Sequence, residues 1–111
     1  MKQYLNAKQA TKLIKLGVEK PKSIVDKYYD FDTEDYIEVN LYSIGELIEM
    51  LPRTIKNYYD LNILSSSQGW WVLYGMIGDG DMWSVEYEIY RSELIDALFA
   101  MIIKLKEEGK I

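Results

Sequence analysis

Acidic side chains are the residues of this sequence whose spacing comes nearest to a chemical site. The run from Asp30 to Asp35 (Asp-Phe-Asp-Thr-Glu-Asp) begins like the loop that binds calcium between two helices. Such a loop has glycine at its sixth position and a bidentate glutamate at its twelfth, where this sequence has Asp35 and Leu41. We therefore expect no dedicated metal site here, and no other pattern in the chain indicates a cofactor.

A second pair of carboxylates, Glu86 and Glu88, occupies alternate positions of a predicted strand. Their spacing along a strand is about 7 Å, which is within the range used by glycosidases for an acid and a base. Both residues share the polar face of that strand with Ser84, and an open, solvated pair lacks the separated pKa values that such catalysis requires. We interpret Glu86 and Glu88 as surface residues rather than catalytic ones.

Several classes of enzyme are excluded because the chain contains no histidine and no cysteine. Disulfides, thiolate catalysis, zinc–thiolate sites and the Ser-His-Asp triad all need one of these residues. A phosphate-binding loop is also absent, since Ser65–Gln68 has neither the lysine nor the flanking glycines. The sequence favours a protein that is not an enzyme.

Two adjacent tryptophans suggest a contact surface. Trp70 and Trp71 lie in a predicted strand, so their side chains point to opposite faces of the sheet. One of them is expected in the core and the other on the outer face with Glu86 and Glu88. These four residues are the candidate site for a protein partner.

Charge is distributed unevenly along the chain. Residues 1–27 carry a net charge of +5, residues 28–99 carry -11 and residues 100–111 carry +1. The basic segment, with Gly17 ahead of Ile24 and Val25, resembles a helix-turn-helix, and the alternative hypothesis is therefore a DNA-binding regulator. The acidic middle makes nucleic acid an unlikely partner. The candidate nucleic-acid residues are Lys8, Lys12, Lys15 and Lys22.

The N-terminal half is expected to contain short helices and one strand. Asn6 with Gln9, and Ser43 with Glu46, have the spacing of capping boxes at helix starts. Pro52 stops the helix that follows Ser43. The expected elements are helices at 7–16, 23–29 and 43–50, an acidic turn at 30–35 and a strand at 36–41.

The C-terminal half is expected to form a meander followed by a long helix. Strands at 58–64, 70–77 and 82–90 alternate in polarity and are joined by turns at 65–69 and 78–81. Ser92 is expected to cap a helix over 92–108 that ends at Gly109. This helix is apolar almost all round, so the sheet covers one side, and the N-terminal helices or a second copy cover the other. The candidate self-association residues are Ile95, Phe99 and Ile103.

Together these patterns predict a single α+β domain over residues 1–111. A three-stranded antiparallel meander packs against the C-terminal helix, with two or three short helices in the N-terminal half. The sequence has neither a secretory signal nor a run of about 20 apolar residues, so we expect no membrane association and a cytoplasmic location.

Several segments carry a resemblance to known sequences. They are Leu13–Val18, Tyr28-Tyr29, Tyr42–Pro52, Trp71–Tyr74 and Glu93–Leu98. In these segments the chain resembles small uncharacterised proteins of phages, prophages and mobile elements of gut Bacteroidetes. The resemblance implies an intracellular accessory protein that acts on a host component, and it transfers no functional residue. We therefore expect a non-enzymatic interaction protein with a protein partner of unknown identity or with a second copy of itself as a homodimer.

Overall fold

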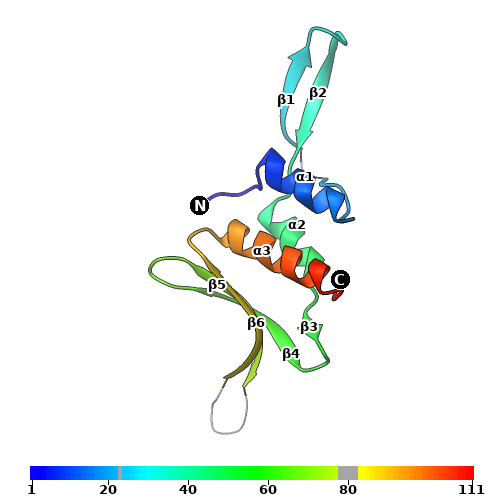
Figure 1. Ribbon diagram of the computed structural model, residues 1–111. Helices are drawn as coiled ribbons and strands as arrows, with labels where there is room; N and C mark the ends of the chain where they lie inside the picture. Colours follow the sequence, from blue (N-terminus) through cyan, green and yellow to red (C-terminus); the bar gives the residue numbers. More distant parts are fainter. Residues whose placement is uncertain (23, 78–82) are drawn as a thin grey trace.

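The C-terminal helix lies on an antiparallel sheet in the computed structural model, which describes residues 1–22, 24–77 and 83–111 (Figure 1). The sheet has four strands in the order β3-β4-β5-β6, and a separate two-stranded sheet pairs β1 with β2. The fold is therefore α+β, and its main sheet has one strand more than the predicted meander. The elements are α1 (Ala7–Lys15), β1 (Ile24–Asp30), β2 (Asp35–Asn40), α2 (Ile44–Met50), β3 (Thr54–Ile55), β4 (Tyr59–Ser65), β5 (Trp70–Ile77), β6 (Trp83–Arg91) and α3 (Leu94–Glu107).

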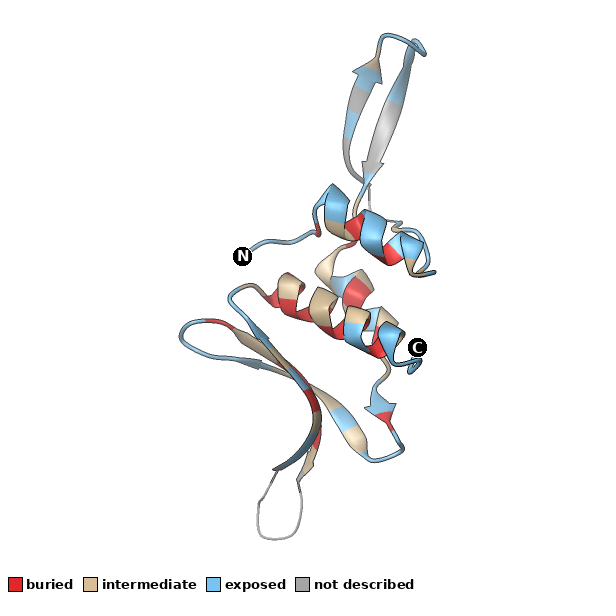
Figure 2. Cartoon of the chain, viewed as in Figure 1, coloured by how far each residue is buried: buried red, intermediate tan, exposed pale blue. Residues whose placement is uncertain are grey.

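Helix α3 forms the centre of the core. One side contacts β5 and β6, and α2 packs on another side. Figure 2 shows buried residues along the lower side of α3 and further buried positions on α1 and α2. Both sides of α3 are covered within one chain, as its apolar circumference requires. Its fully buried side chains are Ile95, Ala97, Leu98, Met101, Ile102 and Leu105.

The two predicted capping boxes are present. The side chains of Asn6 and Ser43 each accept a hydrogen bond from the backbone N–H three residues on. In turn, the side chains of Gln9 and Glu46 accept a hydrogen bond from the backbone N–H of the cap residue. The expected start of α3 at Ser92 is wrong. Glu93 occupies the cap position, and its carboxylate accepts a hydrogen bond from the backbone N–H of Lys2 at 3.1 Å.

The predicted helix at 23–29 is also wrong, because Ile24–Asp30 is strand β1. This segment is rich in β-branched and aromatic residues, and β2 supplies an antiparallel partner for it. The expected strand and acidic turn next to it are confirmed, since residues 31–34 connect β1 to β2. The resulting hairpin, which we call the arm, projects from the body beside α1 (Figure 1).

A β-bulge interrupts the regular alternation of β6. Tyr74 faces Tyr87 and Gly75 faces Val85, so Glu86 is an extra residue on β6. The predicted alternation of polarity along 82–90 is therefore broken at the bulge: Tyr87 is buried, whereas Val85, two positions before it, is 41% exposed. The predicted turn at 78–81 lies outside the described residues.

Candidate functional site

A cleft separates one face of α1 from α3. Its volume is about 560 Å³, and Phe99 is the residue that α3 contributes to it. On α1, the cleft is lined by Ala7, Lys8, Gln9, Thr11, Lys12 and Lys15. The three lysines recur at intervals of four and three residues and therefore lie on one side of the helix. The buried Ala10 and Leu13 hold the other side of α1 in the core.

A second hollow of about 330 Å³ continues from the first and shares Lys12 and Phe99 with it. Beyond these two residues it is lined by Ile89, Arg91, Ala100, Ile103, Lys104 and Glu107. We call the two hollows together the basic groove. Five cationic side chains and one carboxylate line it, around an apolar floor that includes Phe99 and Ile103.

The lysines of α1 give the groove its electrostatic character. Among the described residues, Lys8, Lys12 and Lys15 form no ion pair. Lys104 lies 5.6 Å from the centre of the Tyr87 ring and 3.9 Å from the Glu108 carboxylate. The positive charge of α1 is thus uncompensated and accessible to a partner.

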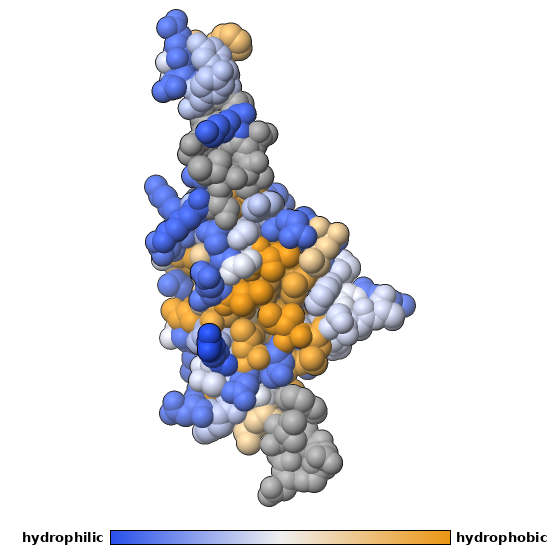
Figure 3. Space-filling model, turned by 180° about the vertical axis from the view of Figure 1, so that it is seen from behind, coloured by the Kyte–Doolittle hydropathy of each residue, from blue (hydrophilic) through white to orange (hydrophobic). Residues whose placement is uncertain are grey.

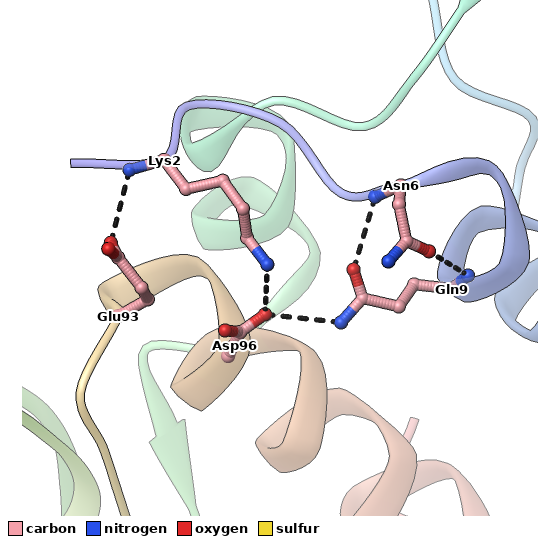
Figure 4. Close-up of polar contacts among 5 residues, drawn as sticks. All are labelled: Lys2, Asn6, Gln9, Glu93 and Asp96. Carbon is pink, nitrogen blue, oxygen red and sulfur yellow. Dashed lines mark hydrogen bonds and ion pairs between the residues drawn. The ribbon is translucent and has the colours of Figure 1, made fainter.

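A polar cluster fixes the distance between α1 and α3 at one end of the groove (Figure 4). Asp96 accepts hydrogen bonds from Lys2 Nζ at 2.8 Å and from Gln9 Nε2 at 3.1 Å, and Gln9 also belongs to the capping box of Asn6. Partial burial acts to raise the pKa of the Asp96 carboxyl, but the bonds from Lys2 and Gln9 outweigh it and hold the pKa below its ordinary value. The ionised carboxylate therefore ties the N-terminal segment to the first turn of α3.

The three self-association candidates have different positions. Ile95 is fully buried and cannot be a contact residue on the surface, because its side chain is part of the core. Phe99 and Ile103 are partly exposed and line the basic groove. Two of the three self-association candidates, Phe99 and Ile103, thus lie beside lysines that were predicted to bind nucleic acid.

The nucleic-acid candidates are also divided. Lys8, Lys12 and Lys15 line the groove, whereas Lys22 lies near α2 and pairs with Glu19 at 3.3 Å. The helix-turn-helix prediction is wrong in its second helix, since the element after α1 is a strand.

The partner-binding candidates lie on the main sheet but do not form one cluster. Trp70 packs against the edge of the core. Trp71 lies on the opposite face, where its ring is 4.8 Å from that of Tyr90. Glu88 shares this outer face, and Glu86 at the bulge pairs with Lys56. The prediction that the two tryptophans divide between the faces agrees with this arrangement.

A third hollow, of about 590 Å³, lies between α2 and β3–β4. Its apolar residues are Ile48, Leu51 and Leu61, and its charged residues are of both signs. Figure 3 shows apolar residues gathered on the middle of the body when the molecule is seen from behind. Mixed charge at the hollow gives no preference for an acidic or a basic partner, in contrast to the basic groove.

The tip of the arm carries a group of exposed aromatic side chains that was not predicted from the sequence. Phe31 is 84% exposed, and Tyr36 is 69% exposed. The ring of Tyr29 contacts both of them edge-on, with centroid distances of 4.9 Å to Phe31 and 5.3 Å to Tyr36. Aromatic residues on both sides of the acidic turn were the available signal, but the helix assigned to 23–29 concealed that they meet.

Two common kinds of site are absent from the part of the chain that the structure describes. The described residues include no group of three acidic side chains that could hold a metal ion. No helix within the described ranges is long and apolar enough to cross a bilayer.

Comparisons with protein-family models, curated proteins and solved structures find no match for this chain.

Proposed function

We propose that this chain is a non-enzymatic interaction protein that binds an acidic segment of a protein partner in the basic groove. The observation that carries the proposal is the set of three lysines on α1 that form no ion pair with the residues the structure describes, above an apolar floor with Phe99. A segment with carboxylates and one large apolar side chain would satisfy both parts of the groove. In the mobile-element setting that the sequence resemblance implies, the partner would be a host component or a second copy of the chain.

The apolar floor favours a protein partner over nucleic acid. Phosphates would pair with the lysines but leave Phe99 and Ile103 without an apolar contact. Residues 28–99 carry a net charge of -11, which would repel the remainder of a nucleic acid over about 10 Å at physiological salt. DNA binding through the lysines of α1 remains the alternative that the experiment must address.

The expected affinity is modest and sensitive to salt. Burial of one large apolar side chain in the groove contributes about 1.5–3 kcal/mol. Each exposed ion pair adds about 0.2–1 kcal/mol. These terms must also offset the ordering of the bound segment, so we expect a dissociation constant weaker than about 1 µM.

Fluorescence anisotropy tests the proposal with two labelled probes, a short peptide of alternating aspartate and phenylalanine and a 20-base-pair DNA duplex. We expect the peptide to bind, with about tenfold weaker affinity for Lys12→Glu and for Phe99→Ser. Lys110→Glu is the matched control, because it makes the same charge change at an exposed residue outside the groove. Binding of DNA without binding of the peptide, or peptide binding that Lys12→Glu leaves unchanged, would overturn the proposal.

A further inference from the structure

The arm exposes a cluster of aromatic side chains to solvent, as a contact surface does. Its tip holds the exposed aromatic side chains Tyr29, Phe31 and Tyr36, and the ring of Tyr29 contacts the other two. Figure 3 shows an apolar patch at the far end of the arm against strongly hydrophilic atoms. Exposed aromatic clusters of this kind are typical of contact surfaces.

The acidic residues make the tip of the arm negatively charged. Four carboxylates and no cation lie between positions 30 and 35. Asp32 and Glu34 are exposed, and Asp30 is half-buried and accepts a hydrogen bond from the backbone N–H of Asp32 at 2.9 Å. The tip is therefore an acidic segment with a large apolar side chain, Phe31, at its end.

The basic groove has the complementary properties. It offers five cations, one carboxylate and an apolar floor, where the tip offers four carboxylates and three aromatic rings. Its larger hollow, of about 560 Å³, is of a size that can take one or two aromatic side chains. The carboxylates of the tip can therefore pair with the cations of the groove, and the aromatic rings of the tip can contact its apolar floor.

The tip of one chain is directed away from its own groove. The arm extends outward from α1, on the side away from α3 (Figure 1). The groove lies between α1 and α3. β1 has seven residues, which corresponds to a reach of roughly 23 Å at the usual strand rise of about 3.3 Å per residue. A contact between tip and groove must therefore join two copies.

We propose that the tip of the arm of one copy docks in the basic groove of a second copy, with Phe31 on the apolar floor and the carboxylates facing the lysines of α1. This inference rests on the proposed function, because it names the occupant of the same groove. Reciprocal exchange of two arms produces a closed dimer with two identical contacts.

Analytical ultracentrifugation from 5 to 500 µM protein in 50 mM salt tests the inference. We expect a concentration-dependent dimer that dissociates in 500 mM salt. Asp32→Lys in the tip and Lys12→Glu in the groove should each weaken the dimer about tenfold, and the double variant should recover most of the loss because both signs are reversed. Phe31→Ser should weaken it as well, although its site is too exposed to affect folding.

Two control variants should dimerise like the unchanged chain. Tyr58→Ser removes an aromatic side chain that is 56% exposed outside the arm, and Lys110→Glu reverses a charge outside the groove. A chain that stays monomeric at 500 µM, a dimer that Phe31→Ser leaves intact, or a double variant weaker than both single variants would overturn the inference. If the chain is monomeric but the labelled acidic peptide still binds, the inference fails and the proposed function stands. If the peptide also fails to bind, both fail.

Discussion

The two isoleucines that flank Phe99 on α3 provide a sharp test of how this helix is buried. Ile95 is fully buried, whereas Ile103 is partly exposed at the groove. Replacement by alanine removes the same three carbon atoms from each. At about 0.8 kcal/mol per buried methylene the transfer cost at Ile95 is about 2.4 kcal/mol, and the cavity raises the expected loss to about 3–4 kcal/mol. At Ile103 the neighbouring structure buries only part of these atoms, and we expect a loss of about 1 kcal/mol.

Urea denaturation, followed by tryptophan fluorescence at 1 µM protein, measures both losses without a contribution from self-association. The higher helix propensity of alanine applies to both variants and cancels in the comparison. With a slope of roughly 1.5 kcal/mol/M, a difference of 2 kcal/mol separates the two midpoints by about 1.3 M. Equal midpoints for Ile95→Ala and Ile103→Ala would refute the reasoning, because the two side chains would then be equally buried.

Three further predictions concern individual contacts. Gly69→Ala should destabilise the chain by about 1–3 kcal/mol in the same assay, because a Cβ there would lie 2.5 Å from the carbonyl oxygen of Arg91; an unchanged midpoint would contradict this. Tyr74 donates a hydrogen bond to the carbonyl of Pro52 at 2.7 Å, and burial raises the pKa of its hydroxyl. The unfolded chain therefore loses this proton at a lower pH than the folded chain, and the free energy of unfolding should fall as pH rises above about 10. Tyr74→Phe should make that fall smaller, and it should lower the free energy of unfolding by about 0.5–1.5 kcal/mol at neutral pH. The lowered pKa of Asp96 implies a stabilisation that is present above about pH 4 and disappears as pH falls through the native pKa; Asp96→Asn should remove this part of the acid dependence, and identical acid titrations of the two proteins would disprove it.

The elements that local chemistry specifies were predictable from the sequence. Capping boxes at Asn6 and Ser43 locate the starts of α1 and α2, because each cap satisfies backbone N–H groups within a few residues of itself. Strand β5 begins and ends where its aromatic and β-branched residues begin and end. Such signals need no knowledge of distant segments.

Elements that depend on contact with another segment were not predictable from their own residues. The segment at 24–30 has the apolar spacing of a short helix, but its pairing with β2 decides the outcome. Strand β3 has two residues and exists only because β4 lies beside it. At α3, the N–H of Lys2, 91 residues away, engages Glu93 at the cap position.

The candidate site could be predicted only in parts. Lys12 and Phe99 were each identified as contact residues, but for different partners, since they lie 87 positions apart in the sequence. The packing of α1 over α3 joins them in one groove. Nothing in the local pattern around either residue indicates the other.

The bulge at Glu86 lies on β6, a strand at the edge of the main sheet, and changes the shape of that edge. Among the described strands, β6 pairs with β5 alone, so its other side offers unpaired backbone groups along nine residues. A long, flat edge of this kind can template the addition of foreign strands and lead to aggregation. The inserted residue bends the strand and the neighbouring carboxylate of Glu88 adds repulsion, which together make the edge a poor template. The molecule is thereby left to form its associations through side chains, where charge and shape can select a partner.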